Sequence, residues 1–338
     1  MQIVYLSARP ELLTETLGHV AHFAPFIDDV IVVAPQRLES TMQRAGEPSG
    51  LPVTVVTDED VLGLASHEIK ALNHATRNYR LRAAAIRLNM IDDVFIMSDD
   101  DGRPMVPIDI DTFTNDEGQH RRYYFHSLAQ WRHSVTDFDH SLLHSLVLLR
   151  QRGFPDPLAY SSHMPQIIDK VIYVAVADAI EAEAATYTPD EWSPYFTIGA
   201  EMAPTRFADP QPFVTLGWPQ FPGEWPHETV PPRHVFENHH PEFHQEGGLY
   251  AGLPSACEPD TVDETNREKI IRWHRLERHV RELSFPHDVN QPWTTDSPMR
   301  KLAFRGLHTA RGAYRYLTLD DRARLTELEG RIRRLEED

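Results

Sequence analysis

Cysteine is almost absent from this 338-residue sequence, which contains only Cys257. One thiol cannot form an intrachain disulfide bond, and it cannot build a zinc site based on cysteine. The sequence also lacks any run of the ~20 consecutive apolar residues that a membrane-spanning helix requires. It opens on a strand-like segment at residues 1–6, without the features of a secretion signal. These absences predict a cytoplasmic protein without an integral membrane segment.

Positive charge is also scarce, because 33 lysine and arginine residues face 51 aspartate and glutamate residues. The formal net charge of -18 repels the phosphate groups of nucleic acids, so the sequence predicts no nucleic-acid partner. Anionic small molecules are not excluded, because a bound cation or a local group of arginines reverses the sign of the potential inside a cleft.

The first third of the sequence contains a regular alternation of short apolar runs and helical patterns. The apolar runs cover residues 3–7, 29–34, 53–56 and 94–97, and helical spacing covers residues 14–23 and 73–88. This alternation is typical of β-α-β units. We therefore expect an α/β fold, in which a mostly parallel sheet carries helices on both faces.

The pattern is less regular beyond residue 120. Helical spacing covers residues 141–152 and 165–185, whereas residues 189–254 are rich in proline, tryptophan and histidine and indicate ordered loops with short strands. Helices are expected again at residues 263–283, 298–317 and 319–337, with alternating charges on their exposed faces. These C-terminal helices would either pack on the rest of the chain or form a homodimer.

Three consecutive aspartates, Asp99, Asp100 and Asp101, follow the apolar run at residues 94–97. In open α/β sheets ligands bind at the carboxyl ends of the strands, where this triplet would lie. Carboxylates suit Mg²⁺ or Mn²⁺, and such an ion shares its shell with phosphate oxygens. We expect Asp99 and Asp101, two residues apart in an extended segment, to bind the ion, with His239 as a third ligand. The alternative for the three aspartates is a solvated acidic turn. The alternative for His239 and the histidines around it is a solvated loop.

Other polar residues are placed to contact a nucleotide. Ser7 and Arg9 follow the first strand, at the same edge of the sheet as the aspartates. Asn73 and Arg77 lie one helical turn apart, so Arg77 would bind phosphate and Asn73 the sugar or the acidic triplet, with Asp100 beside them. Each of these residues has a plain surface position as its alternative.

Candidates for acid or base chemistry come from the second half of the sequence. His163 stands in a polar loop before Pro165, where it would act as a base, bind phosphate or bind an acceptor, unless backbone carbonyls satisfy it. Glu201 and Asp209 are candidates for a general base toward an acceptor hydroxyl. Six aromatic residues would either stack on sugar rings or belong to the core: Trp192, Tyr195, Phe196, Trp218, Phe221 and Trp225.

Several segments resemble conserved regions of the Stealth proteins. The matching segments are residues 16–33, 72–75, 95–104 and 162–165, which include Asn73, the three aspartates with the following Gly-Arg-Pro, and His163. The resemblance implies a glycosyltransferase-A-like core and transfer of sugar 1-phosphates in polysaccharide synthesis, with Asn73, the aspartates and His163 at the site. The opening segment of the family is reduced here to residues 4–9, and its last conserved region is missing.

Because of these departures, we predict a hexosyltransferase on the same scaffold. A nucleotide sugar, for example GDP-mannose, would donate to a hydroxyl group of a saccharide acceptor, assisted by Mg²⁺ or Mn²⁺. Residues 1–260 would form the catalytic domain, with a nucleotide-binding half at 1–120 and an acceptor-binding half at 121–260, and residues 261–338 a helical region. The alternatives are Stealth-type transfer of a sugar 1-phosphate and a non-catalytic carbohydrate-binding protein.

Overall fold

The computed structural model describes residues 1–131, 136–161, 164–216, 234–255 and 261–284. The chain divides into two compact units, one made of Met1–Gly217 and Pro231–Ile270, the other of Trp218–Val230 and Ile271–Asp338. The central sheet and all of the residues discussed below as a site belong to the first unit. The expected domain boundary at residue 260 stays a prediction.

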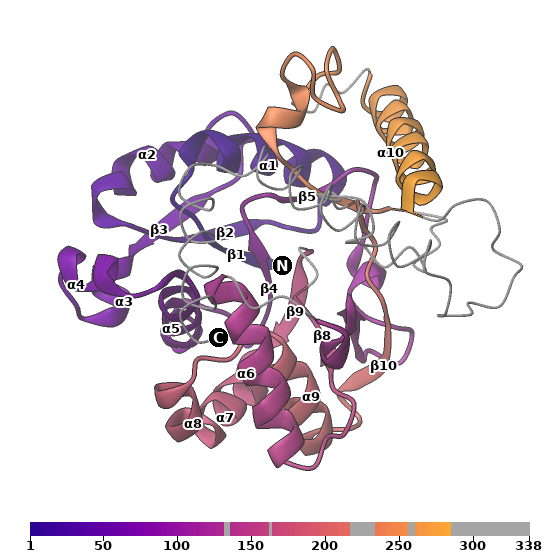
Figure 1. Ribbon diagram of the computed structural model, residues 1–338. Helices are drawn as coiled ribbons and strands as arrows, with labels where there is room; N and C mark the ends of the chain where they lie inside the picture. Colours follow the sequence, from indigo (N-terminus) through magenta and orange to yellow (C-terminus); the bar gives the residue numbers. More distant parts are fainter. Residues whose placement is uncertain (132–135, 162–163, 217–233, 256–260, 285–338) are drawn as a thin grey trace, which may run out of the picture. The chain divides into compact units, whose positions relative to one another are not determined.

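A five-stranded sheet forms the centre of the first unit, with the strand order β3-β2-β1-β4-β9 (Figure 1). The strands are β1 (Gln2–Leu6), β2 (Asp29–Ala34), β3 (Val53–Thr57), β4 (Val94–Asp99) and β9 (Gln166–Asp169). The first four run parallel, and β9 runs antiparallel to β4. The expectation of an α/β fold with a mostly parallel sheet is confirmed.

Side chains alternate between the two faces of this sheet, and each face has its own apolar core. Ile3 and Tyr5 of β1 pack with residues of helix α1 (Pro10–Phe23) in one cluster. Val4 belongs to a second cluster, with residues of α7 (Lys170–Ala179) and α9 (Ser193–Met202). Because both faces are covered by helices, the parallel strands are apolar on both sides, which explains their continuous apolar runs.

The remaining helices lie around this framework (Figure 1). They are α2 (Glu39–Gln43), α3 (Asp58–Leu62), α4 (Ser66–Ala71), α5 (His74–Ala85), α6 (Asp137–Gln151) and α8 (Glu181–Thr186). Helix α10 (Val262–Ser284) begins in the first unit and ends in the second. Side chains cap several of these helices, because the free N–H groups of a first turn need acceptors. Thr57 accepts from the backbone of α3, Asn73 from that of α5, and Thr136 from that of α6.

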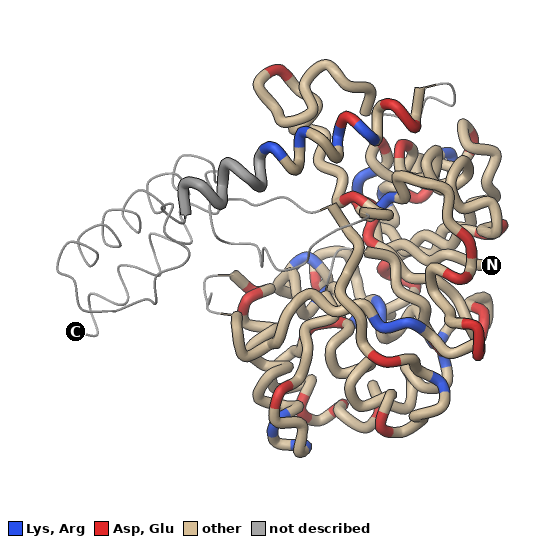
Figure 2. The backbone as a smooth tube through the Cα atoms, turned by 90° about the vertical axis from the view of Figure 1, so that its right-hand side faces the viewer, with Lys and Arg blue, Asp and Glu red and all other residues tan. Residues whose placement is uncertain are grey.

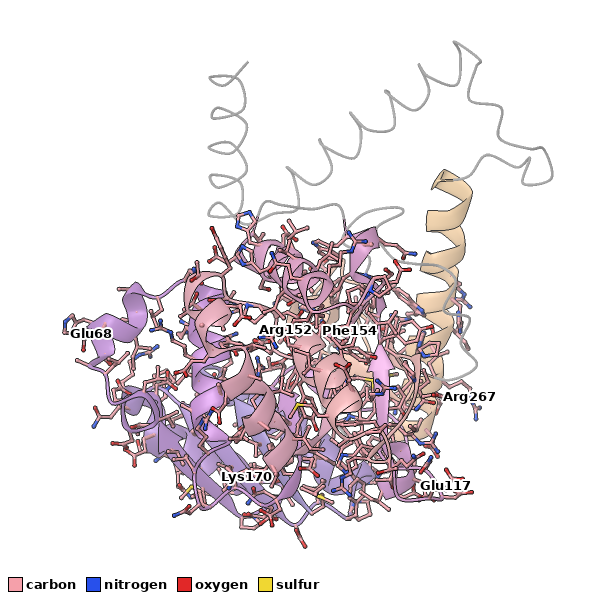
Figure 3. The ribbon with its side chains drawn as sticks, turned by 90° about the horizontal axis from the view of Figure 1, so that it is seen from below. Glu68, Glu117, Arg152, Phe154, Lys170 and Arg267 are labelled. Atoms are coloured by element: carbon pink, nitrogen blue, oxygen red, sulfur yellow. The ribbon has the colours of Figure 1, made fainter. Side chains whose placement is uncertain are left out.

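The prediction of one helix over residues 165–185 was wrong in its first part, because residues 166–169 form strand β9. Ile167 and Ile168 are buried on opposite faces of the sheet, beside Ile96 and Phe95 of β4. A short apolar run has no period that separates a buried strand from a helix. The helix begins only at Lys170, which is labelled in Figure 3. Its Nζ donates to the carbonyl oxygens of Leu88 at 2.7 Å and Ile91 at 2.8 Å.

The prediction of loops and short strands over residues 189–254 missed helix α9, which has a proline in its first turn. Proline is favourable there because the first N–H groups of a helix have no intrahelical partner. Trp192, Tyr195 and Phe196 are buried in the core, so they are not exposed platforms for a sugar. Trp218, Phe221 and Trp225 lie outside the described residues.

Short strands complete the first unit: β5 (Gly102–Pro104), β6 (His120–Tyr124), β7 (His126–Ser127), β8 (Leu158–Ala159), β10 (Phe207–Pro212), β11 (Thr215–Leu216) and β12 (Phe236–Asn238). β12 runs antiparallel to β5 and pairs Asn238 with Gly102. The backbone N–H of His239 then donates to the carbonyl oxygen of Asp101 at 2.6 Å. The end of β12 therefore holds the turn that contains the acidic triplet.

A network of buried charges joins these late segments to β5. Glu237 is fully buried and pairs with Arg103 at 2.6 Å and with Lys269 of α10 at 3.0 Å. Burial alone would raise the pKa of Glu237, but the two cations hold it well below its ordinary value. A buried ion pair of this kind is costly to break, because the remaining partner is left as an uncompensated charge.

No helix in the described part of the chain is both long enough and apolar enough to cross a membrane. Figure 2 shows lysine and arginine residues mixed with aspartate and glutamate along the backbone, without one continuous basic face in this view.

Candidate active site

A cavity of about 510 Å³ lies at the carboxyl ends of the parallel strands. Leu6, Ser7, Ala8 and Arg9 line it after β1, Pro35 and Arg37 after β2, Asp58 and Glu59 after β3, and the acidic triplet after β4. Helices α4 and α5 contribute Ser66, Ile69, Lys70, His74, Ala75, Arg77, Asn78, Leu81 and Arg82. The rest of the lining consists of Phe138, Ser141, Pro189, Asp190 and Glu191. This edge of the sheet is where open α/β folds bind ligands.

Arg9 neutralises two carboxylates of the acidic triplet. Its guanidinium donates to both oxygens of Asp100, with 3.1 Å between Nε and Oδ2, and to Oδ2 of Asp101 at 3.0 Å. Ser7 Oγ donates to the same Oδ2 of Asp100 at 2.6 Å. Asp100 is buried, and burial raises its pKa even though Arg9 and Ser7 favour the charged form. Asp100 therefore serves to hold Arg9 and Ser7 in place.

Asp99 points to a different partner, because β4 ends at Asp99 and the next two residues form a turn. Its Oδ1 accepts from the buried guanidinium of Arg82, which also forms an ion pair with Glu191. The Arg82 guanidinium lies 5.2 Å from the ring centroid of Trp192, within the range of a cation–π contact. Arg82 thus connects Asp99 of the acidic triplet to Glu191, another residue of the cavity lining.

Glu191 is a carboxyl group of the cavity lining that forms an ion pair with Arg82. Burial raises its pKa to about 7, an effect that Asp99 and Asp190 reinforce and Arg82 opposes. Its backbone is fixed because Oδ1 of Asp190 accepts from the N–H groups of Trp192 at 3.1 Å and Ser193 at 2.9 Å. A base whose pKa is near the working pH transfers protons most efficiently.

Three cations on the wall of the cavity have no hydrogen bond or ion pair with any described residue. They are Arg37, which is exposed after β2, Lys70 of α4 and Arg77 of α5. The other two cations of the wall, Arg9 and Arg82, are held by carboxylates. Unpaired arginine and lysine side chains beside a cavity are suited to bind phosphate groups.

The oxygens of the triplet do not fit Mg²⁺ or Mn²⁺ in this arrangement. Both oxygens of Asp100 and one of Asp101 are engaged by Arg9 and Ser7, and the other oxygen of Asp101 is buried without a hydrogen-bond partner. Asp99 is paired with Arg82. Within the described residues, no group of three histidine, cysteine, aspartate or glutamate side chains is placed to hold a metal ion. Two arginines supply the positive charge here.

The structure brings six of the residues singled out in the sequence together at the cavity: Ser7, Arg9, Arg77, Asp99, Asp100 and Asp101. Asn73 lies next to it, but its side chain is exposed and accepts from the backbone N–H of Thr76 at 2.8 Å, as the cap of α5. His239 is buried outside the cavity lining, with its ring nitrogen 2.9 Å from Glu15.

Two of the three residues proposed for acid and base chemistry do not line the cavity. Glu201 is exposed on α9 and Asp209 is exposed on β10, and neither lines the cavity. His163 lies outside the described residues. Their roles stay predictions.

Sequence reasoning missed Arg82, Glu191 and Asp58, which all line the cavity. Glu191 stands in the segment Pro-Asp-Glu-Trp-Ser-Pro, where an aspartate before Ser-Pro is a signal for a helix start. That signal places an acidic pair at a helix N-terminus, and it is the one sequence feature that would have drawn attention to Glu191.

No protein-family model and no curated protein matches this sequence, so the resemblance to Stealth proteins stays a prediction. Among solved structures, similar ones include the apo form of mouse xyloside xylosyltransferase 1, with a TM-score of 0.42 and 8% identity over 71% of this chain and 98% of that chain. The galactosyltransferase LgtC in complex with donor and acceptor sugar analogs has a TM-score of 0.38 and 10% sequence identity, and the match covers 79% of this chain and 95% of that chain. An active-site mutant of LgtC has a TM-score of 0.42 and 9% sequence identity, and the match covers 78% of this chain and 95% of that chain.

Proposed function

We propose that this protein is a glycosyltransferase that uses a nucleotide sugar as donor. The observation that carries the proposal is the composition of the cavity, whose lining combines the unpaired cations Arg37, Lys70 and Arg77 with the carboxyl group of Glu191. The cations suit the pyrophosphate of a nucleotide sugar, and Glu191, whose pKa is about 7, suits the activation of an acceptor hydroxyl group.

The reaction is a displacement at the anomeric carbon of the donor. The acceptor hydroxyl group attacks this carbon while Glu191 accepts its proton, and the bond to the nucleoside diphosphate breaks with its electron pair on the departing phosphate oxygen. Arg77 and Lys70 bind the phosphates of the donor, and their positive charges stabilise the negative charge of the departing nucleoside diphosphate. Arg82 keeps Glu191 in position through their ion pair.

The finer predictions concern the sugar and the metal. The donor would carry a hexose, with GDP-mannose as the example, and the acceptor would be a saccharide. Stealth-type transfer of a sugar 1-phosphate differs in the bond that breaks. We derive no step through Mg²⁺ or Mn²⁺, because Arg9 and Arg82 occupy the carboxylates that would hold the ion.

The released nucleotide tests the reaction class. We would incubate the protein with nucleotide sugars and saccharide acceptors, with and without Mg²⁺ or Mn²⁺, and identify the product by chromatography. Release of a nucleoside diphosphate that depends on the acceptor is the expected result. Release of a nucleoside monophosphate would replace the proposal by sugar-phosphate transfer, and binding without any turnover would favour the non-catalytic carbohydrate-binding protein.

The unpaired cations lead to a prediction about binding. A nucleoside diphosphate at 100 times its Kd should stabilise the protein by ~2.7 kcal/mol, because it binds only the folded state. We expect this thermal shift to persist in EDTA, since arginines already neutralise the acidic triplet. Arg77→Ala should raise the Kd about tenfold, through the loss of a charged hydrogen bond worth ~1.5 kcal/mol.

Arg80→Ala is the matched control for Arg77→Ala, because Arg80 is exposed on the same helix and does not line the cavity. It should bind nucleotide as the wild type does. A shift that appears only with Mg²⁺ or Mn²⁺, and that Asp101→Ala abolishes, would contradict metal-independent binding. It would show instead that an ion displaces Arg9 from the triplet.

A further inference from the structure

Asp58 is a buried carboxyl group at the end of the cavity that lies farthest from the acidic triplet. It is the first residue of α3, directly after β3, it lines the cavity, and it is 6% exposed. The strand order β3-β2-β1-β4 separates the ends of β3 and β4 by three strand spacings of ~4.8 Å, which is roughly 14 Å. The cavity therefore extends across the edge of the sheet, with Asp58 and Glu59 at the carboxyl end of β3.

Asp58 has no hydrogen bond or ion pair with any residue that the structure describes, and its Oδ1 is buried without a partner. Its neighbours are satisfied: Asp60 accepts from Thr57 Oγ1 at 2.6 Å, and Glu59 accepts from Ser66 and from the backbone N–H of Gln36. Burial raises the pKa of Asp58 to about 6, with a contribution from Glu59 that Arg77 opposes. Buried polar groups are normally hydrogen-bonded, so this exception requires an explanation.

A bound ligand supplies that explanation. If the proposed function is correct, the sugar and the leaving phosphate lie near Glu191 and Arg9, and the phosphates lie along the unpaired cations. The other end of the donor, its nucleobase, then reaches the carboxyl end of β3, where Asp58 lies. This inference rests on the proposed function.

We propose that Asp58 recognises the base of a guanine nucleotide. An ionised carboxylate offers two acceptor oxygens and no donor. Guanine presents two adjacent donors on its Watson–Crick edge, N1–H and the N2 amino group, which match the two oxygens. Uracil presents a single donor between two carbonyl oxygens, and adenine and cytosine each present one donor beside one acceptor. Only guanine pairs with both oxygens of an ionised Asp58.

Binding of four diphosphates tests this assignment: GDP, ADP, CDP and UDP, each titrated by calorimetry into the wild-type protein at pH 8. We expect GDP to bind at least tenfold more tightly than the other three, because one bidentate base contact gives discrimination of about this size. Inosine diphosphate, which lacks the N2 amino group, should bind at least tenfold more weakly than GDP. This ligand comparison needs no variant and so does not depend on the folding of one.

Asp58→Asn changes the pattern of donors and acceptors without changing the shape of the side chain. A carboxamide offers one donor and one acceptor, which matches N3–H and O4 of uracil. We expect GDP to lose at least tenfold in affinity and the preference for GDP over UDP to disappear. Asp60→Asn is the matched control, because it removes the same charge from the same short helix at a position outside the cavity lining. It should keep the preference for GDP.

The outcomes separate the two proposals. If the wild type binds all four diphosphates equally, or binds GDP and inosine diphosphate equally, the guanine assignment is overturned and glycosyl transfer stands. The same holds if a folded Asp58→Asn protein keeps its preference for GDP. If none of the diphosphates binds the wild type, the proposed function itself fails, and the assignment of Asp58 fails with it.

Discussion

Glu191→Gln is expected to lower kcat by about 10²- to 10⁴-fold, the usual contribution of a positioned general base. Glutamine keeps the size of the side chain and its place beside Arg82, but it cannot accept a proton from the acceptor hydroxyl group. Because the base must be ionised, kcat/KM of the wild type should rise with pH and level off above about 7, the pKa of Glu191. In Glu191→Gln this pH dependence should disappear.

Glu201→Gln decides between the competing assignments of the base. Glu201 was a candidate for the general base in the sequence, whereas Glu191 was not, but Glu201 is exposed on α9 and does not line the cavity. We expect this variant to keep both kcat and the pH profile. A normal kcat in Glu191→Gln, measured with saturating donor and acceptor, would remove Glu191 from the reaction.

Glu237→Gln is expected to lower the free energy of unfolding by ~3–5 kcal/mol, the cost of leaving buried charges without their partner. The variant would keep Arg103 and Lys269 buried, at 0% and 1% exposure, with no carboxylate between them. Urea denaturation at pH 7 measures this loss. Glu246→Gln, at an exposed glutamate of the neighbouring loop, should change stability by less than ~0.5 kcal/mol.

The effect of Glu237→Gln should also depend on pH. The pKa of Glu237 in the folded protein lies well below its ordinary value of 4.5, so its stabilisation is fully present above that value. As the pH falls through the pKa of the folded state, the carboxyl group is protonated and the stabilisation is lost. The gap between the wild type and the variant should therefore narrow below pH 4.5, and a constant gap would assign the loss to packing.

The parallel part of the fold could be predicted because its strands are buried on both faces. Residues 30–34 and 94–97 are apolar without interruption, and each follows a helical pattern that brings the chain back to the same edge. The acidic triplet was predicted at the ligand edge for the same reason, and it lines the cavity. Strand β9 was missed because four residues are too few to show a period.

The chemistry of the site could be predicted less well, because it depends on pairs that are distant in the sequence. Arg9 and Arg82 reach the triplet from two different elements, so their neutralisation of its carboxylates has no local pattern. Asp58 stands in the run Thr57-Asp58-Glu59-Asp60, where nothing in the sequence distinguishes it from its acidic neighbours, yet it is buried and unpaired among the described residues. Propensity and spacing describe backbone positions, whereas the protonation and pairing of a side chain follow from the tertiary structure.

The backbone bond between His239 and Asp101 has a consequence for biosynthesis. Strands β1 to β4 can pair as soon as they leave the ribosome, because they are close in sequence and packed by their own helices. The turn with the aspartates is different, since β12 is translated in the last third of the chain. A nascent chain can therefore pair its parallel strands before β12 is translated, and until then the acidic turn lacks the backbone hydrogen bond from His239.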